Sequence, residues 1–404
     1  MKTQDISVYI HIPFCRRRCG YCDFNTFSGM DSYIDAYVDA LCQEIKFTME
    51  VSGTILPVHT IFLGGGTPSI LKSRQLEKII KTLDGVTSLS RDAEITLEAN
   101  PETVTAKSLI DLRNAGFNRI SFGMQSADKR DLEVLDRAHT HQSVINAVRW
   151  SKAAGFHHIN LDLIYGIPGQ KVTGWLKTLD SAFALEVDHY SAYALTVEED
   201  TPLRSRVDAG EIQPLEDDLV GEMYEACIQA MNGRGYAQYE ISNWAADEGS
   251  RCRHNLQYWR YLPYLGFGAG AHGFFGLKRT ENEKSIPSYI QRIHSNTTPV
   301  FPEGRACVKI TELTRWESLE ENMMVSLRLT EAGVSIREME ARHGTRIDQV
   351  FSRQIARLLR GGLLEWQRDG DVLRLTPRGR LLGNRVFSEF IGNAEPIEFA
   401  AGKR

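Results

Sequence analysis

Three cysteines near the amino terminus are the side chains with the clearest capacity for chemistry. Cys15, Cys19 and Cys22 fall within a stretch of eight residues. The other four are scattered along the chain, as Cys42, Cys227, Cys252 and Cys307. An odd number of unevenly spaced cysteines does not suit a disulfide framework, which proteins of the cytosol rarely use. The compact CxxxCxxC group therefore predicts metal ligation.

The spacing of these thiols favours an iron–sulfur cluster over zinc. Three thiolates on one irregular loop can bind three irons of a cubane, which leaves the fourth iron without a protein ligand and open to a substrate or cofactor. Zinc with a distant fourth ligand is the alternative, but zinc sites prefer paired CxxC knuckles and the sequence has no second knuckle. Arg16, Arg17 and Arg18 would favour thiolates, and Gly20 would allow a tight backbone path.

The first half of the chain alternates short apolar strands with helical patterns, which must position this loop. Strands are predicted at residues 7–14, 60–66, 94–100, 119–126, 158–166 and 189–196. Helices are predicted at residues 31–50, with Asp31 as N-cap, and at 105–115 and 141–154, which end at Gly116 and Gly155. Six βα units imply a parallel sheet covered by helices, either open and doubly wound or a partial barrel. In both folds, chemistry gathers at the carboxyl ends of the strands.

The second half follows a different pattern. Residues 216–232 look helical, 236–275 are rich in aromatics and glycine, and 278–306 are polar and are interpreted as a linker. From about residue 310, helices followed by a hairpin predict a winged-helix-like domain. We therefore expect a barrel domain at 1–210, a middle segment at 211–309 and a mostly helical domain at 310–404. Clustered arginines raise DNA binding as an alternative, although a solvated helix face is the simpler explanation: Arg346, Arg353, Arg357 and Arg360.

Composition excludes several classes of protein. The 404 residues are 42% hydrophobic and 25% charged, as in a soluble globular protein, and the net charge is −5. This charge argues against a protein that coats nucleic acid or an anionic membrane. No apolar run approaches the roughly 20 residues that span a bilayer, and the start of the chain lacks the apolar region of a signal peptide. We expect a cytoplasmic protein.

Six motifs together resemble one known family. CxxxCxxC directly after an apolar strand is the signature of the radical S-adenosylmethionine (SAM) superfamily. Beyond this signature, the chain resembles a narrower family in six motifs, namely YIHIPFCRRRCGYCDF, FLGGGTPS, LEANPE, SFGMQS, NLDLIYGIPGQ and HNLQYW. Jointly these resemble the oxygen-independent coproporphyrinogen dehydrogenases and their relatives, the HemW heme chaperones, from about residue 7 to the end. The resemblance implies a partial (β/α)6 barrel of the radical SAM type followed by a smaller winged-helix-like domain.

The resemblance also implies how the cofactors bind. The open iron of a [4Fe–4S] cluster on Cys15, Cys19 and Cys22 would chelate SAM, and reduction of the cluster would cleave SAM to a 5′-deoxyadenosyl radical. Backbone amides of the glycine run at 64–66 are expected to meet SAM at close range. Positions that match the family's contacts to SAM, or to a second SAM, are Tyr9, Tyr21, Gly65, Gly66, Thr67, Glu98, Gln125, Arg137, Asp162 and Ala194. Considered without the family, most of these are strand-end polar residues satisfied internally.

Two departures separate this chain from the dehydrogenases. Those enzymes carry a fourth cysteine two residues after the third, where this chain has Phe24. They also have a longer extension before the cluster than the 14 residues that precede Cys15 here. The chaperone branch shares both features. We therefore favour a heme chaperone over an enzyme that decarboxylates coproporphyrinogen III propionates, with an unassigned radical enzyme as a third hypothesis.

The HNxxYW motif of the chaperone branch is present as His254, Tyr258 and Trp259. The resemblance implies that these residues bind heme, because imidazole is a common axial ligand and the aromatic rings supply apolar surface. Judged from the residues alone, the motif is a capped aromatic loop in which His254 is only hydrogen-bonded. Cys252 and His272 are rival ligands that the sequence does not favour.

Partners follow from the same resemblance. They are heme, hemoproteins that receive it (respiratory enzymes or storage proteins) and an electron donor for the cluster. Nucleic acid is not expected as a partner. A homodimer and a peripheral association with the membrane are further options in the family, for which the sequence shows no anchor.

Overall fold

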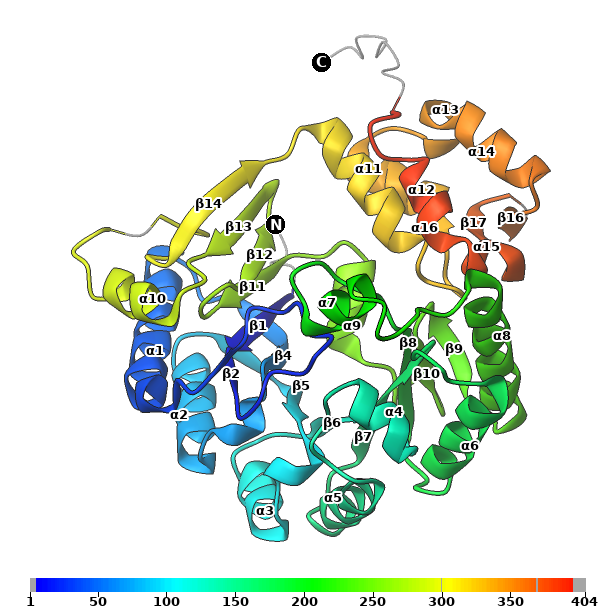
Figure 1. Ribbon diagram of the computed structural model, residues 1–404. Coiled ribbons are helices and arrows are strands. Elements are labelled where there is room, and N and C mark those ends of the chain that lie inside the picture. Colours follow the sequence, from blue (N-terminus) through cyan, green and yellow to red (C-terminus); the bar gives the residue numbers. More distant parts are fainter. Residues whose placement is uncertain (1–4, 299, 368–369, 395–404) are drawn as a thin grey trace, which may run out of the picture.

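The computed structural model describes residues 5–298, 300–367 and 370–394 (Figure 1). One twelve-stranded sheet runs through the larger part of the chain, in the order β14-β13-β12-β11-β1-β4-β5-β6-β7-β8-β10-β9. Its central strands are β1 (Ile6–Ile12), β4 (Pro57–Gly65), β5 (Ser88–Ala99), β6 (Arg119–Gln125), β7 (His158–Tyr165) and β8 (His189–Ala194). Each of these six pairs in parallel with its neighbour.

Helices cover the outer face of this arc of strands (Figure 1). They are α1 (Ile34–Val51), α2 (Ser73–Asp84), α3 (Ala106–Asn114), α5 (His141–Ala153) and α6 (Val172–Phe183). In the sheet order β1 and β8 are not neighbours, so the barrel is open between them. The predicted partial barrel is therefore confirmed, with a strand at each of the six predicted places.

Local signals placed most helix ends correctly. Gly116 and Gly155 adopt φ values of 103° and 84° directly after α3 and α5, as expected of residues that end a helix. The predicted N-cap at Asp31 is wrong. A 3₁₀ turn (Asp31–Tyr33) precedes α1, and no side chain caps the amino end of the turn or of α1.

The middle of the chain extends the same sheet instead of linking two domains. Six strands belong to it: β9 (Ala237–Glu240), β10 (Asn243–Ala245), β11 (Tyr264–Phe267), β12 (His272–Phe275), β13 (Lys278–Asn282) and β14 (Cys307–Glu312). Strand β10 pairs antiparallel with β8, and β11 pairs in parallel with β1.

The interpretation of residues 278–306 as a linker is therefore wrong. The segment contains β13 and α10 (Ile286–Ile293), whose Ile286, Tyr289 and Ile293 lie in the main core. Strand β13 was missed because its sequence, KRTEN, has no apolar residue and therefore no apolar alternation. The helical spacing of the three α10 residues was the available signal.

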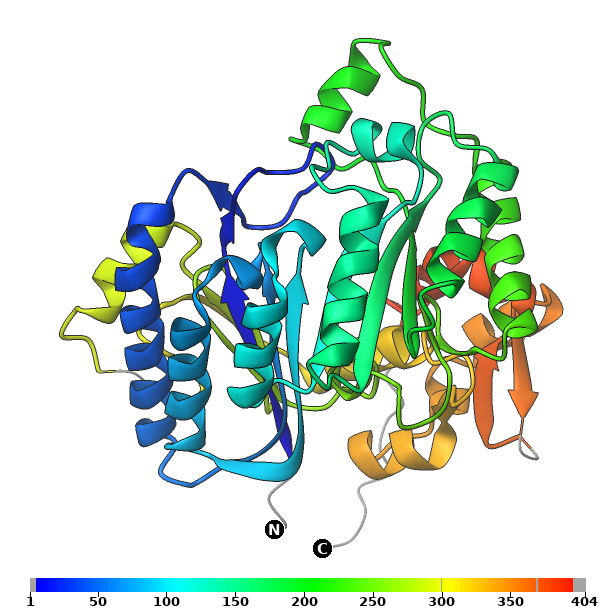
Figure 2. The ribbon, with the colours of Figure 1, turned by 90° about the horizontal axis from the view of Figure 1, so that it is seen from below.

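Shorter elements complete the larger part: β2 (Phe14–Cys15), β3 (Phe27–Ser28), α4 (Lys129–Val134), α7 (Pro202–Asp208), α8 (Asp217–Gly233) and α9 (Arg253–Trp259). The cluster loop and α7 lie above the same edge of the sheet (Figure 2), where the Leu203 amide donates to the Gly20 carbonyl at 2.7 Å. That edge is where the parallel strands end.

The carboxyl-terminal part is mostly helical and has its own core, as predicted. Its elements are α11 (Arg315–Ser326), β15 (Val334–Ser335), α12 (Ile336–His343), α13 (Ile347–Val350), α14 (Ser352–Arg360), β16 (Leu364–Gln367), β17 (Val372–Leu375), α15 (Pro377–Leu381) and α16 (Gly383–Ser388). Two of its clustered arginines form ion pairs, Arg346 with Asp348 and Arg357 with Glu389. Across the described ranges, no helix combines the length and apolar character needed to cross a membrane.

A buried carboxylate ties α1 to the added strands. Glu44 accepts hydrogen bonds from the Tyr289 hydroxyl (2.6 Å), the Asn282 amide (2.7 Å) and the Gly268 backbone N–H (2.8 Å). Burial raises its pKa to about 7, because the three donors only partly offset the loss of water. One side chain thus holds α10, β13 and the turn after β11 against α1.

We predict that Glu44→Ala lowers the free energy of unfolding by about 3 kcal/mol or more, because it leaves three buried donors without an acceptor. Urea unfolding followed by circular dichroism measures this. Glu50→Ala is the matched control, since Glu50 lies on the same helix and is exposed. Equal effects of the two substitutions would contradict the assigned role.

Candidate functional site

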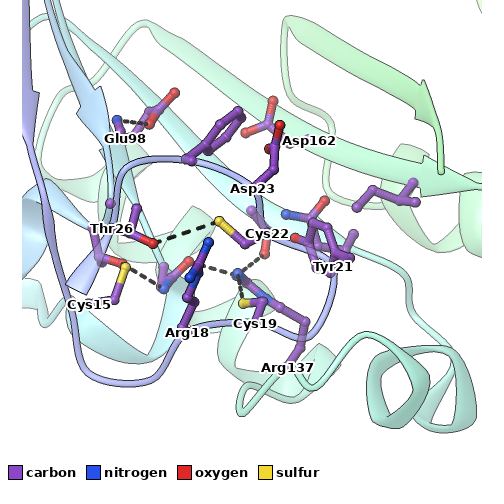
Figure 3. A pocket seen from close by; sticks show the side chains of 18 of the residues that line it. Cys15, Arg18, Cys19, Tyr21, Cys22, Asp23, Thr26, Glu98, Arg137 and Asp162 are labelled. Carbon is purple, nitrogen blue, oxygen red and sulfur yellow. Dashed lines mark hydrogen bonds between the residues drawn. The ribbon is translucent and has the colours of Figure 1, made fainter. Parts of the chain in front are cut away.

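The three cysteines lie on the loop between β1 and α1, above the carboxyl ends of the parallel strands. Figure 3 shows their sulfur atoms along this loop, facing the same space. Each thiol has a polar neighbour, which comes from elsewhere in the fold for Cys15 and Cys19 and from the same loop for Cys22. Thr67 Oγ1 lies 3.6 Å from Cys15 Sγ, Arg137 Nη1 donates to Cys19 Sγ at 3.4 Å, and Thr26 Oγ1 lies 3.9 Å from Cys22 Sγ. The three half-buried thiols are therefore oriented by the sheet as well as by their own loop.

Electrostatics around the thiols suit metal-dependent deprotonation. Burial raises the pKa of Cys15 and of Cys22. Thiols of this kind release their protons when they bind a metal. No group of three His, Cys, Asp or Glu side chains in the described ranges converges closely enough for a single metal ion. A cubane has a different requirement, because its three thiolates bind three different irons.

The glycine run after β4 locks against the cysteine strand. The Gly66 amide donates to the Ile12 carbonyl at 2.9 Å, and the Thr67 amide donates to the Phe14 carbonyl at 2.8 Å. A Cβ on Gly66 would lie 2.6 Å from that Phe14 oxygen, so the close approach requires glycine. The amides of Gly65, Gly66 and Thr67 are therefore all engaged within the protein, because Gly65 donates to Glu98 at 3.1 Å. The run brings β4 close to the cluster loop, and close approach of SAM to its backbone stays a prediction.

A cavity of about 460 Å³ opens beside the thiols, within the size range of cofactor sites. It is lined by the three cysteines and by nine of the ten predicted SAM-contacting residues, namely Tyr21, Gly65, Gly66, Thr67, Glu98, Gln125, Arg137, Asp162 and Ala194. The tenth, Tyr9, lines a neighbouring cavity. Gln125 adopts a φ of 62° in the left-handed region, at a register shift between β6 and β7.

Several lining residues were missed from the sequence, among them Asn100, Ser121 and Tyr193. Asn100 accepts from Arg137 Nη2 at 2.6 Å and donates to Thr67 Oγ1 at 3.1 Å, so it connects two residues that contact the cysteines. Its signal was its position directly after the apolar run of a strand, the same signal that distinguishes Glu98.

Two half-buried carboxyl groups, Glu98 and Asp162, line this cavity on the side of the sheet. Burial and the nearby Asp162 raise the pKa of Glu98 to about 8. Burial also raises the pKa of Asp162, although it accepts hydrogen bonds from Ser121 Oγ (2.7 Å) and Asn160 Nδ2 (2.8 Å). Raised pKa values favour the protonated forms of the two groups, and a nearby cation would favour their charged forms instead.

The HNxxYW motif forms α9, which lies inside the barrel below the cavities. The Glu94 carboxylate of β5 accepts from the backbone amides of Arg253 (3.0 Å) and His254 (2.9 Å) and so caps the amino end of α9. Buried Arg119 lies 3.8 Å from the same carboxylate. The motif is thereby fixed to the inner face of the sheet.

His254 is not presented to a ligand in this structure. Its side chain is 1% exposed, and it stacks on Phe62 with ring centroids 5.1 Å apart. Both ring nitrogens contact hydroxyls at 2.8 Å, Nδ1 that of Thr60 and Nε2 that of Tyr258. Burial lowers its pKa to about 3. His254 therefore has the surroundings of a hydrogen-bonded histidine packed in the core, which is the role that the residues alone favour.

The other two motif residues, Tyr258 and Trp259, lie in different surroundings. Trp259 packs under the Arg328 guanidinium, 4.4 Å from its ring centroid, and its carbonyl accepts from Ser326 Oγ, which ties α9 to the carboxyl-terminal part. Tyr258 instead lines a second cavity of about 420 Å³. The rival Cys252 is 3% exposed, whereas the rival His272 is exposed on the wall of that cavity.

Family models match both parts of the chain. The model of the radical SAM superfamily matches residues 9–182, and that of the HemN C-terminal domain matches residues 313–382. Among solved structures, coproporphyrinogen III oxidase (HemN) of Escherichia coli aligns with a TM-score of 0.81 over 96% of this chain and 90% of that protein. Because the identity is 24%, this likeness concerns the fold alone.

Curated relatives match almost end to end. The heme chaperone HemW of Bacillus subtilis is 38% identical over 387 residues, which cover 96% of this chain and 99% of that protein. The heme chaperone HemW of Mycobacterium tuberculosis is 37% identical over 97% of this chain and 96% of that protein. The chain belongs to the HemW family of the radical SAM superfamily.

Proposed function

We propose that this chain is a heme chaperone that binds a [4Fe–4S] cluster, SAM and heme and delivers heme to target hemoproteins. The observation that carries this proposal is the near full-length similarity to heme chaperones named HemW, at 38% identity over 96% of the chain. Heme-receiving proteins are partners by the same argument. Respiratory enzymes, storage proteins, an electron donor, a cytoplasmic location, a homodimer and a peripheral membrane contact stay predictions of the resemblance.

Membership of the radical SAM superfamily implies a [4Fe–4S] cluster and SAM as cofactors. We assign the cluster to Cys15, Cys19 and Cys22, which share one loop and one cavity. Bound together, the cluster and SAM supply one-electron chemistry. The chain's own contribution is to orient the thiols through Thr67, Arg137 and Thr26 and to enclose the cavity above the strand ends.

The two carboxyl groups of the cavity suit a cationic cofactor. SAM carries a sulfonium and an ammonium group, and Glu98 and Asp162 are the acidic side chains that line the cavity on the sheet side. Their pKa values are raised chiefly by burial, so a cation would favour their charged forms. Arg137 also lines the cavity, beside Cys19, and donates to the Gly123 carbonyl of β6 at 3.0 Å.

The coproporphyrinogen dehydrogenase hypothesis is retained as the second candidate because the fold matches that of HemN. One residue argues against it. Phe24 stands where the dehydrogenases have a fourth cysteine, and its side chain is 62% exposed on the rim shared by the two cavities. A large apolar ring there supplies surface for a porphyrin face but no thiol.

The two functions are separated by parallel anaerobic assays of the reconstituted protein. We expect stoichiometric heme binding and transfer of heme to an apo-hemoprotein, and no protoporphyrinogen from coproporphyrinogen III. Absorption spectra follow the first assay and fluorescence of the oxidised product follows the second. Catalytic formation of protoporphyrinogen, or failure to bind heme, would overturn the proposal.

The cluster assignment is tested by cysteine substitution. Cys15→Ala, Cys19→Ala and Cys22→Ala should each lose most of the iron and acid-labile sulfide, which we expect at about four of each per chain in the unsubstituted protein. Cys307→Ala, on strand β14, is the matched control and should keep the full content. Stoichiometric zinc in place of iron would remove the cubane from the proposal.

The affinity for SAM should rise with pH. Between about pH 6.5 and about pH 8.5, Glu98 loses the proton that its raised pKa retains, so a cation binds increasingly well, by up to about tenfold per pH unit. Isothermal titration of the anaerobic protein measures this slope. Glu98→Gln should remove most of it, whereas Glu133→Gln, on the exposed face of α4, should leave it intact. An unchanged slope in Glu98→Gln would rule out Glu98 as its origin.

A further inference from the structure

We infer that His272, not the motif histidine His254, is the axial ligand of heme iron, and that heme lies in the second cavity between β1, α9 and the β11–β12 turn. The inference rests on the proposed heme binding and adds the place and the ligand. The cavity has a volume of about 420 Å³ and is open on one side, so it would hold part of a porphyrin with the rest exposed.

His272 has the exposure that a ligand needs. It is the first residue of β12, directly after the turn that follows β11 at the edge where the parallel strands end. Within the described part of the chain its ring makes no hydrogen bond, and its side chain is exposed on the cavity wall. Iron binding would therefore displace only water.

The other histidine of this cavity is engaged in hydrogen bonds. His11 Nδ1 contacts the Tyr9 hydroxyl and its Nε2 contacts the Asn25 carbonyl oxygen, each at 2.9 Å. His254 is separated from the cavity by Tyr258, to which its Nε2 is bonded. Ligation by either histidine would require breaking buried contacts, which ligation by His272 does not.

The walls suit a flat aromatic ligand. Tyr9, Tyr258 and Tyr264 line the cavity, and the rings of Tyr258 and Tyr264 meet edge to face with centroids 4.7 Å apart. Such packed rings offer a rigid apolar surface at little entropic cost. The HNxxYW motif thus contributes one tyrosine to the wall, while His254 holds that tyrosine from below.

A positive charge at the rim of the second cavity suits the propionate groups of heme. Lys284 lines the cavity, its side chain is 64% exposed, and it pairs with Glu281 at 3.3 Å. Exposed ion pairs of this kind contribute little, so the ammonium group is available to a second carboxylate. A heme held by His272 would place its polar edge toward solvent and this lysine.

The proposed heme lies next to the cluster site. Phe24, Gly65 and Glu98 line both cavities. Asn25, three residues after Cys22, donates its side-chain amide to the carbonyls of Ala269 and Lys284, each at 3.1 Å. The loop that carries the cysteines is thereby hydrogen-bonded to the turn before His272 and to the segment after β13. Ligand binding at one site would therefore affect the other site.

Absorption spectroscopy of the ferric and ferrous heme complexes tests the ligand. His272→Gly should shift the Soret band and weaken heme binding at least about tenfold, and added imidazole should restore the original spectrum. His272→Cys should give the spectrum of a thiolate-ligated heme. His157→Ala, which removes an exposed histidine before β7, should leave both spectrum and affinity unchanged.

The outcomes separate this inference from the proposed function. If the unsubstituted protein binds no heme, the proposed function fails and the inference with it. If heme binds and the spectrum of His272→Gly is unchanged, the ligand assignment alone is wrong. Should His254→Gln lose the native spectrum while circular dichroism shows that it is folded, and His272→Gly keep it, the motif histidine is the ligand. Lys284→Glu should weaken binding without shifting the Soret band; an equal affinity would remove the lysine from the site.

Discussion

The six strands β1, β4, β5, β6, β7 and β8 each pair in parallel with the next, and the rest of the molecule depends on this constraint. Because all these strands point the same way, their carboxyl ends meet at one edge, and the segments that follow them must turn there. The cluster loop after β1, Glu98 at the end of β5 and Arg137 after β6 come from distant parts of the sequence, yet they line one cavity. A reversed strand would carry its end to the opposite edge.

The inner face of the arc is polar, which is unusual for the inside of a barrel and requires that every group finds a partner. Ser121 and Asn160 donate to Asp162, while His189 contacts both Asn160 and the Tyr239 hydroxyl. Deeper still, Glu94 faces Arg119 and caps α9. In place of an apolar core, this network faces α9, which fills the lower part of the barrel.

The two cavities share a rim, and that proximity gives the proposed function a physical basis. A ligand held by the β11–β12 turn would lie beside the cysteine loop, with Phe24 between them. The carboxyl-terminal part reaches the same region through α9, because Arg328 covers Trp259 and Ser326 donates to its carbonyl. Helix α9 thus contacts both the second cavity, through Tyr258, and the carboxyl-terminal part, through Trp259.

The sequence by itself predicted the six parallel strands and the cysteine triad, because apolar runs, glycine ends and a compact CxxxCxxC group are local signals. The nine SAM-contacting positions that line the first cavity came from the family resemblance, and Asn100, Ser121 and Tyr193 were missed. Tertiary structure decided the rest. Strands β9–β14 are only three to six residues long, so the strands that they pair with identify them. The Gly66 amide is engaged because β1 lies beside it. The resemblance implied that His254 binds heme, whereas the residues alone favoured a hydrogen-bonded packing role; its burial between Thr60, Phe62 and Tyr258 depends on where α9 packs. Exposure of His272 is likewise set by the turn before it, since accessibility is a property of the assembled fold.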